Sequence, residues 1–217
     1  MQLKPIDSVS GLSGTTFKSD YYNKSKPVVF SNFLEDSPAL SKWSYAYLQE
    51  KAGNIQVNLY GKEDAFNDHV TSPPVAKSTF GEYLQLIETK PTDLRLFLFN
   101  LLKRVPELQI DIVVNDITGG RVLQWLPYLF FGGAGSSVRY HYDIDMSHVF
   151  LSQLEGVKKV WLFPLEQSVF LYKLPFNFHG LANLKNPDYQ RYPGLKYING
   201  WETDLTKGDT LFIPSGY

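Results

Sequence analysis

From about residue 121 onward, the chain consists of short apolar runs that turn residues interrupt at fairly even intervals. Glycine, proline, asparagine and aspartate separate the runs, and these residues favour turns. The runs are Leu126–Phe131, Arg139–Asp143, Val149–Leu154, Val157–Phe163, Gly200–Leu205 and Thr210–Ile213. Many short strands at such spacing predict an antiparallel sandwich or barrel.

The chain before this point has a different texture, in which helical patterns outnumber strands. The candidate strands and helix caps are Lys26–Phe30, Ile55–Tyr60, Ser37, Ser44 and the capping-box pattern Thr79–Glu82. Leu94–Leu102 is largely apolar and is compatible with either a helix or a strand. We expect one domain over residues 1–217, with an N-terminal α+β elaboration over residues 1–120 and a β core over residues 121–217.

Composition limits the classes of protein to which the chain can belong. Its 217 residues are 43% hydrophobic and 15% aromatic, which suits a sheet-rich core and an aromatic-lined pocket. The net charge of −1, without any basic block, argues against nucleic-acid binding. The sequence has no cysteine, no secretory leader pattern and no apolar run of about 18 residues. We therefore expect a cytoplasmic protein without a disulfide, a thiolate site or a membrane helix.

His141 and Asp143 are the strongest candidates for metal binding. They lie two residues apart in a predicted strand, so their side chains point to the same face. Such a pair can supply two ligands of a 2-His-1-carboxylate triad, which holds Fe(II) with positions left open for a co-substrate and oxygen. The same triplet is also compatible with two polar residues on a solvent-facing strand.

Lys158 and Lys159 occupy a predicted strand whose two faces are both apolar. Alternation places Lys158 on the face of Val160, and Lys159 on the face of Trp161. An ammonium group over an apolar surface usually has an anionic partner, because an unpaired buried charge is costly. A small dicarboxylate is one candidate partner, and the alternative is that both lysines extend to solvent at the hairpin end. The periodicity does not choose between these readings.

The remaining histidines have less specific patterns. His148 is a candidate hydrogen-bond donor near the metal pair, a substrate contact or a structural histidine. His179 is the one histidine that follows His148, so it is a candidate third ligand by elimination. It lies near the start of an irregular segment, residues 178–196, that resembles a lid or binding loop. His69 is predicted to lie in a loop.

Hydroxyl groups near the candidate pair are potential contacts for a bound carboxylate. Ser136 and Ser137 belong to the turn that precedes the predicted strand. Tyr128, Tyr140 and Tyr142 are expected to flank the pocket, although a buried tyrosine often only packs and bonds locally. Ser137 and Tyr128 are our candidate cofactor contacts.

A series of motifs runs along nearly the whole chain, from about residue 15 to the end. They are Lys26–Phe30, Trp43-Ser44, Tyr47-Leu48, Phe80–Leu84, Gly135–Asp143, Gly156–Lys159, Leu162–Pro164, Asn186–Pro193 and Gly208–Pro214. Each motif is weak alone. Their order and spacing together resemble the cupin-like JmjC family, related to the asparaginyl hydroxylase that acts on hypoxia-inducible factor.

The resemblance implies a mainly β fold, a double-stranded β-helix of the cupin or jelly-roll type, with an N-terminal helical region. It implies Fe(II) and 2-oxoglutarate as cofactors, and a dioxygenase that hydroxylates a protein or peptide side chain or a small molecule. By motif match, His141 and Asp143 would be iron ligands. Lys158, rather than Lys159, would pair with the distal carboxylate of 2-oxoglutarate, because an ammonium group in a water-excluding pocket binds a carboxylate well. Relatives often dimerise, which leaves a homodimer as an expectation.

The chain departs from the family pattern in three places. Val138 stands three residues before His141, where relatives often carry threonine or serine. The hairpin after Asp143 is longer than in the asparaginyl hydroxylase, and the third ligand histidine of relatives follows the equivalent of Tyr217. We therefore expect that ligand beyond Tyr217, in a longer chain. The alternative is a non-enzymatic cupin that binds a small molecule or peptide and lacks a complete iron site.

Overall fold

The computed structural model describes residues 1–61, 73–113, 117, 127–173 and 177–217. The described residues form two compact units. The first unit holds residues 1–35 and 139–217, and the second holds the described residues from 36 to 138. Whether residues 1–217 form the single domain expected from the sequence, with its division near residue 120, stays a prediction.

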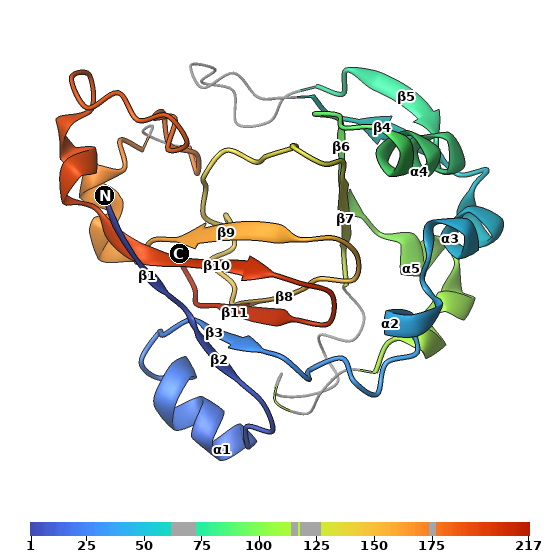
Figure 1. Ribbon diagram of the computed structural model, residues 1–217, viewed down its shortest axis with the longest axis horizontal. Helices are drawn as coiled ribbons and strands as arrows, with labels where there is room; N and C mark the ends of the chain where they lie inside the picture. The colour runs from blue at the N-terminus through green and yellow to red at the C-terminus, as the bar shows by residue number, and fades with distance from the viewer. Residues whose placement is uncertain (62–72, 114–116, 118–126, 174–176) are drawn as a thin grey trace. The chain divides into compact units, whose positions relative to one another are not determined.

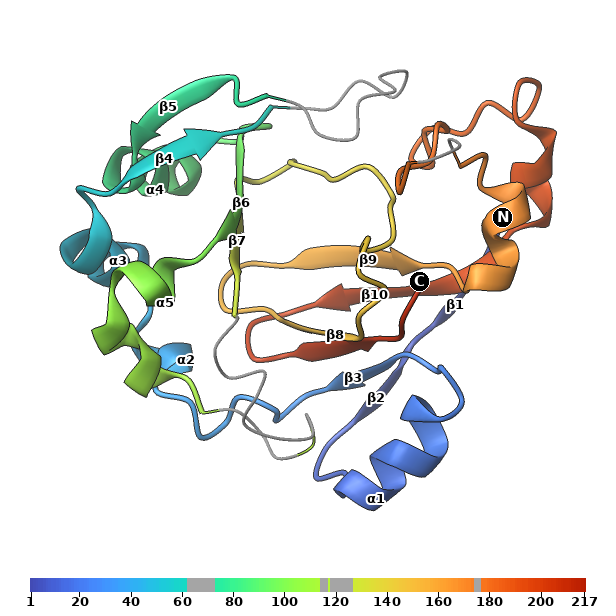
Figure 2. The ribbon, with the colours of Figure 1, turned by 180° about the vertical axis from the view of Figure 1, so that it is seen from behind.

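The first unit contains two β-sheets (Figure 1). The predicted strands from residue 149 onward are divided between them, two in each sheet. The first sheet has the order β1-β10-β9, formed by Gln2–Pro5, Asn199–Leu205 and Lys158–Leu162. The second has the order β2-β3-β11-β8, formed by Asp7–Val9, Val28–Phe30, Thr210–Ile213 and Val149–Ser152. The chain passes from one sheet to the other between β8 and β9 and again between β10 and β11, which is the winding of a jelly roll (Figure 2).

The core of this unit lies between the two sheets. Leu162 and Leu205 from the first sheet pack with Val29 and Leu211 from the second, and Ile6 joins them. Leu205 and Leu211 are fully buried, and full burial of such a side chain contributes about 1.5–3 kcal/mol. The strands that the short apolar runs at 149–154, 157–163, 200–205 and 210–213 predicted are present, and the mainly β fold is confirmed.

Short helical segments cover part of the first unit. α1 (Gly14–Phe17) continues into a π-helical turn, Lys18–Tyr22, and 3-10 helices span Leu165–Phe170 and Pro193–Tyr197. Phe17 is the buried residue of α1, and its ring meets that of Phe212 on β11 edge-on with centroids 4.9 Å apart. This contact holds α1 against the second sheet.

The second unit combines two β-ladders with the longer helices. β4 (Gln56–Leu59) pairs with β5 (Ala76–Thr79), and β6 (Arg95–Phe99) pairs with β7 (Leu129–Gly132). Its helices are α2 (Ala39–Lys42), α3 (Tyr45–Ala52), α4 (Phe80–Thr89), α5 (Leu101–Arg104) and the 3-10 helix Pro106–Asp111. The fully buried Tyr83 of α4 places its hydroxyl 3.0 Å from two carbonyl oxygens, those of Leu94 and Phe131, which ties α4 to β6 and β7.

Several local predictions are confirmed. The candidate strands appear as β3 and β4, and the Ser44 hydroxyl caps α3 by accepting from the Tyr47 N–H. The capping box at α4 is complete, because the Glu82 N–H donates to the Thr79 hydroxyl and the Thr79 N–H donates to the Glu82 carboxylate.

Other local predictions are wrong or resolved only by the structure. Ser37 does not cap α2, because its hydroxyl is bonded to the backbone of Val113 instead. Residues 139–143 form no regular strand, since within them only His141 makes a β-bridge. The ambiguous stretch Leu94–Leu102 divides at Asn100, whose side chain caps α5. The N-terminal strands β1 and β2 were not predicted, and Leu126 and His69 lie outside the described residues.

A buried carboxylate connects the helices of the second unit. Asp111 is 1% exposed, and it accepts hydrogen bonds from Lys42 Nζ at 2.8 Å, Trp43 Nε1 at 3.0 Å and the Tyr47 hydroxyl at 3.3 Å. Burial alone would raise the pKa of Asp111, but these donors outweigh it and hold the pKa below its usual value.

We predict that Asp111→Asn lowers the free energy of unfolding by about 1–3 kcal/mol at neutral pH, because the buried donors lose a charged acceptor. Since the folded pKa is depressed, the wild-type contribution is present above about pH 4 and is lost as the pH falls through the folded pKa. Urea unfolding at neutral and acidic pH measures this, with the exposed Asp93→Asn as the control. Equal effects of the two substitutions at neutral pH would contradict the prediction.

Candidate active site

His141 and Asp143 lie close together in the first unit. The Nε2 atom of His141 is 3.9 Å from the nearer carboxylate oxygen of Asp143, and the two side chains are 34% and 51% exposed. The Nδ1 atom of His141 is 2.8 Å from the carbonyl oxygen of Arg139. Because a carbonyl oxygen can only accept, Nδ1 carries the proton and Nε2 presents a lone pair. This tautomer suits metal binding through Nε2, with Nδ1–H held by a backbone carbonyl.

The hairpin that follows Asp143 is held by hydrogen bonds within it and by a hydrogen bond from Ser215. The Met146 N–H donates to the carbonyl oxygen of Asp143 at 2.9 Å, and the Ser147 N–H and hydroxyl donate to Asp145. The Ser215 hydroxyl donates to the Met146 carbonyl oxygen at 2.5 Å. These bonds fix the direction in which the chain leaves Asp143.

His148 anchors this hairpin to β11. Its Nδ1 accepts from the Ser215 N–H at 3.0 Å, and its ring stacks on Phe212 with centroids 5.5 Å apart. Burial lowers the pKa of His148. A ring nitrogen that accepts from a backbone N–H fits a neutral, packed histidine, which is the structural reading among those considered for this residue.

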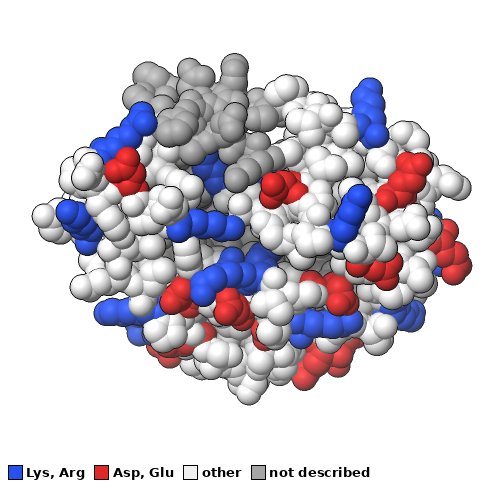
Figure 3. All heavy atoms as spheres, turned by 45° about the horizontal axis from the view of Figure 1, so that its top comes forward, with Lys and Arg blue, Asp and Glu red and all other residues white. Residues whose placement is uncertain are grey.

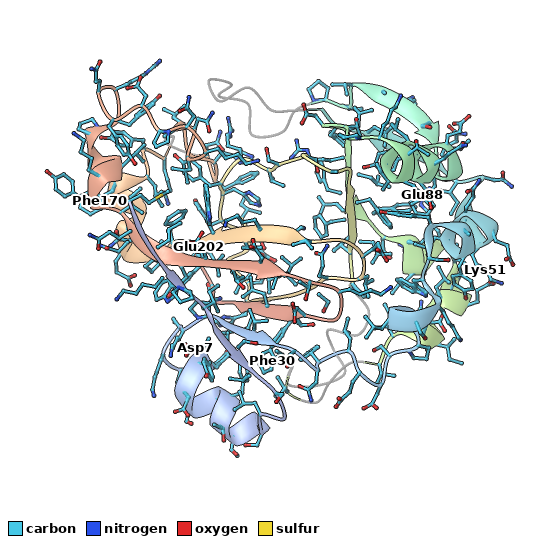
Figure 4. All side chains as sticks on the ribbon, viewed as in Figure 1. Asp7, Phe30, Lys51, Glu88, Phe170 and Glu202 are labelled. Atoms are coloured by element: carbon cyan, nitrogen blue, oxygen red, sulfur yellow. The ribbon has the colours of Figure 1, made fainter. Side chains whose placement is uncertain are left out.

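The two neighbouring lysines on β9 have different surroundings. The Lys159 ammonium lies 3.4 Å from the Glu202 carboxylate and 3.9 Å from that of Asp204, both on β10 (Glu202 is labelled in Figure 4). Lys158 points to the other face of the strand and is half-buried. Within the described ranges, no carboxylate forms an ion pair with Lys158, and burial lowers its pKa. Of the two lysines, Lys158 is therefore the one whose ammonium group is partly removed from water without a carboxylate partner among the described residues.

Tyr128 and Ser137 belong to the second unit, whereas His141, Asp143 and Lys158 belong to the first. Tyr128 is exposed immediately before β7. Ser137 is half-buried and follows a turn in which the Ser136 N–H donates to the Gly133 carbonyl oxygen. Their role as cofactor contacts stays a prediction.

His179 lies close to His141, although little in the sequence indicated this. It is 6% exposed, its backbone forms a β-bridge with that of His141, and the two imidazole rings lie 5.5 Å apart at an angle of 63°. The only sequence signal was its position as the last histidine. Among the residues that the structure describes, no group of three histidine or acidic side chains is placed to hold one metal ion. A third-ligand role for His179 thus stays a prediction.

The surface of the described residues carries mixed charge. On the face shown in Figure 3, basic and acidic side chains are interspersed. In the part of the chain that the structure covers, no helix has the length and hydropathy needed to cross a membrane.

Residues 14–217 match the family described as cupin-like domain. The chain is 30% identical over 220 residues to lysine-specific demethylase JMJ30 of Arabidopsis thaliana, an alignment that covers 97% of this chain and 50% of that protein. It is 26% identical over 231 residues to tRNA wybutosine-synthesizing protein 5 of Homo sapiens, covering 97% and 71%. It is 28% identical over 210 residues to lysine-specific demethylase 8 of Xenopus tropicalis, covering 91% and 45%.

The chain therefore spans about half the length of the two demethylases it resembles. The relation to the asparaginyl hydroxylase of hypoxia-inducible factor stays a prediction. The matched residues include both sheets' central strands, the His141–Asp143 pair and Lys158. The chain belongs to the cupin-like domain family, of the JmjC type.

Proposed function

We propose that this chain is the catalytic domain of an Fe(II)- and 2-oxoglutarate-dependent oxygenase. The observation that carries the proposal is the pairing of His141 Nε2, in the metal-binding tautomer, with the Asp143 carboxylate 3.9 Å away. An imidazole nitrogen and a carboxylate oxygen are donors that suit Fe(II). When bound, iron and 2-oxoglutarate supply the oxidising chemistry, and the protein binds and orients the reactants.

Lys158 supplies the second support for the proposal. Its half-buried ammonium group has a pKa lowered by burial, and no ion pair compensates it among the described side chains. A carboxylate that entered this site would gain a charge-assisted hydrogen bond in surroundings partly shielded from water. Lys158 is thus the residue that would hold the distal carboxylate of 2-oxoglutarate, while Lys159 is already engaged by Glu202 and Asp204.

The chain's own residues also prepare the iron site. The Arg139 carbonyl keeps the proton of His141 on Nδ1, and the bonds that hold the hairpin fix the backbone beside Asp143. Burial raises the pKa of the neighbouring Tyr140 to about 12, so its hydroxyl stays protonated at neutral pH. The expectation that a third ligand histidine follows Tyr217 stays a prediction.

A protein or peptide side chain, or a small molecule, is the substrate class that we propose. Of the three relatives described above, two are named as lysine-specific demethylases and one is named for tRNA wybutosine synthesis. The net charge of −1 and the interspersed charges on the face shown in Figure 3 favour a protein or peptide substrate over tRNA.

We expect that an anaerobic titration of the wild-type chain with Fe(II) and 2-oxoglutarate gives a saturable visible charge-transfer band. His141→Ala and Asp143→Ala should each weaken iron binding by at least about 100-fold, because loss of a direct ligand exceeds the 10- to 100-fold cost of losing its outer partners. Asp204→Asn, a carboxylate on the solvent side of β10, is the control and should bind as the wild type does. A band that survives in His141→Ala contradicts the proposal. Absence of a band in this chain and in one extended past Tyr217 would leave the non-enzymatic cupin binder.

We predict that Lys158→Met weakens 2-oxoglutarate binding by about 10- to 100-fold, the cost of a lost hydrogen bond to a charged group. Calorimetric titration with Mn(II) in place of iron measures this without turnover. Lys159→Met is the matched control, because its partners are Glu202 and Asp204, and it should bind 2-oxoglutarate normally. Equal losses in the two variants would overturn the assignment of Lys158.

Lys158→Met, which should weaken 2-oxoglutarate binding, should stabilise the folded protein when that ligand is absent. Without 2-oxoglutarate, we expect Lys158→Met to raise the free energy of unfolding at neutral pH by about 1 kcal/mol, since it removes a desolvated charge. Because the folded pKa of Lys158 is depressed, the wild type recovers this stability as the pH rises through the alkaline range, and the difference shrinks. Urea unfolding curves at neutral and alkaline pH test this. A destabilised Lys158→Met protein would show that the ammonium already has a partner.

A further inference from the structure

A short antiparallel ladder joins the segment 178–180 to the backbone on both sides of His141. His141 and His179 face each other in this ladder. On its two sides the Tyr142 N–H and the Gly180 N–H donate across it, at 3.2 Å each. The irregular segment predicted as a binding loop is therefore attached directly to the candidate iron ligand.

The side chain of Tyr140 fastens this ladder from one side. Its hydroxyl donates to the carbonyl oxygen of Leu171 and accepts from the Ala182 N–H at 3.1 Å. Its ring packs against a buried cluster that includes Leu171 and Ala182. The ring fills the space beside the Cα of Gly180, so a Cβ added there would overlap the ring carbons and the hydroxyl of Tyr140. Gly180 is thus required by the close approach of the Tyr140 ring.

The ladder brings two aromatic side chains to the His141 imidazole. The centroid of the His141 ring lies 5.5 Å from that of His179 and 6.3 Å from that of Phe178, both in edge-to-face contact. The Phe178 and His179 rings lie 4.2 Å from each other. Together with the bond from Nδ1 to Arg139, these contacts restrict rotation of the imidazole.

We infer that Tyr140 and Gly180 are positioning residues for the iron ligand His141. Their interlock holds Phe178 and His179 against the imidazole, and so directs Nε2 toward the Asp143 carboxylate before any metal binds. The inference rests on the proposed function for the role of His141 as a ligand. The interlock itself is a property of the metal-free protein, and it can be measured separately.

The test is a double-mutant cycle of Gly180→Ala and Tyr140→Ala, read by two measurements. The imidazole C–H resonances of His141 and His179 report ring positions in the metal-free protein, and Mn(II) titration reports ligand geometry. Gly180→Ala should shift the His141 resonances and weaken Mn(II) binding by about 10- to 100-fold, as for a lost outer partner of a ligand. In the Tyr140→Ala background, where the ring is absent, adding Gly180→Ala should change little. Gly61→Ala is the control, since its added Cβ makes only an ordinary contact with Val75 at 3.4 Å.

Two results would overturn the inference. One is a Gly180→Ala protein with wild-type His141 resonances and wild-type Mn(II) affinity. The other is an effect of Gly180→Ala that is equally large with and without the Tyr140 ring. If the wild type binds no Mn(II), the proposed iron site fails, but the resonances of the metal-free protein still decide whether the interlock exists.

If Gly180→Ala fails to fold, Tyr140→Phe tests the same inference. It keeps the ring and removes both hydrogen bonds of the hydroxyl, to Leu171 and Ala182. We expect shifted His141 resonances and a loss of Mn(II) affinity of about 2- to 10-fold, a smaller effect than that of Gly180→Ala because the ring stays in place. Resonances and affinity identical to those of the wild type would overturn the inference.

Discussion

The apolar contact between the two sheets of the first unit is the interaction on which the rest of that unit depends. Leu162 and Leu205 meet Leu211 across the interface, and each belongs to a strand that continues into a turn. The chain changes sheet between β10 and β11, so the contact sets the position of β9, which carries Lys158, relative to β11, which Ser215 follows. The hydrogen bonds of Ser215 then reach the hairpin after Asp143. Core packing and the hydrogen bonds of Ser215 together position the candidate site.

Much of this arrangement was readable in the sequence because its causes are local. Short apolar runs between turn residues predicted β8 to β11, and Thr79 with Glu82 predicted the start of α4. The spacing of His141 and Asp143 indicated a shared direction, although the structure achieves it without a regular strand. Two positions separated by one residue need only an extended backbone to point the same way, so the side chains meet even though the regular strand was a wrong assignment.

Features with distant causes were not readable. The surroundings of Lys158 and Lys159 differ because Glu202 and Asp204 lie on the neighbouring strand β10, far along the chain. Nothing in the sequence around Gly180 indicates that a tyrosine ring occupies the space beside it. The close approach of His179 to His141 likewise joins two parts of the chain that lie far apart in the sequence. Such contacts are set by tertiary packing, which local patterns do not record.

The N-terminal strands have a consequence for how this domain is delimited. β1 and β2 precede residue 14, where the match to the cupin-like domain begins, yet each is the outermost strand of one of the two sheets. β1 pairs with β10, and β2 pairs with β3, both in parallel. A protein trimmed to the family boundaries would expose the backbone N–H and C=O groups of both sheets at once, and unpaired edges of this kind invite association between copies. The limits of the domain by hydrogen bonding thus lie outside residues 14–217, which the family match covers.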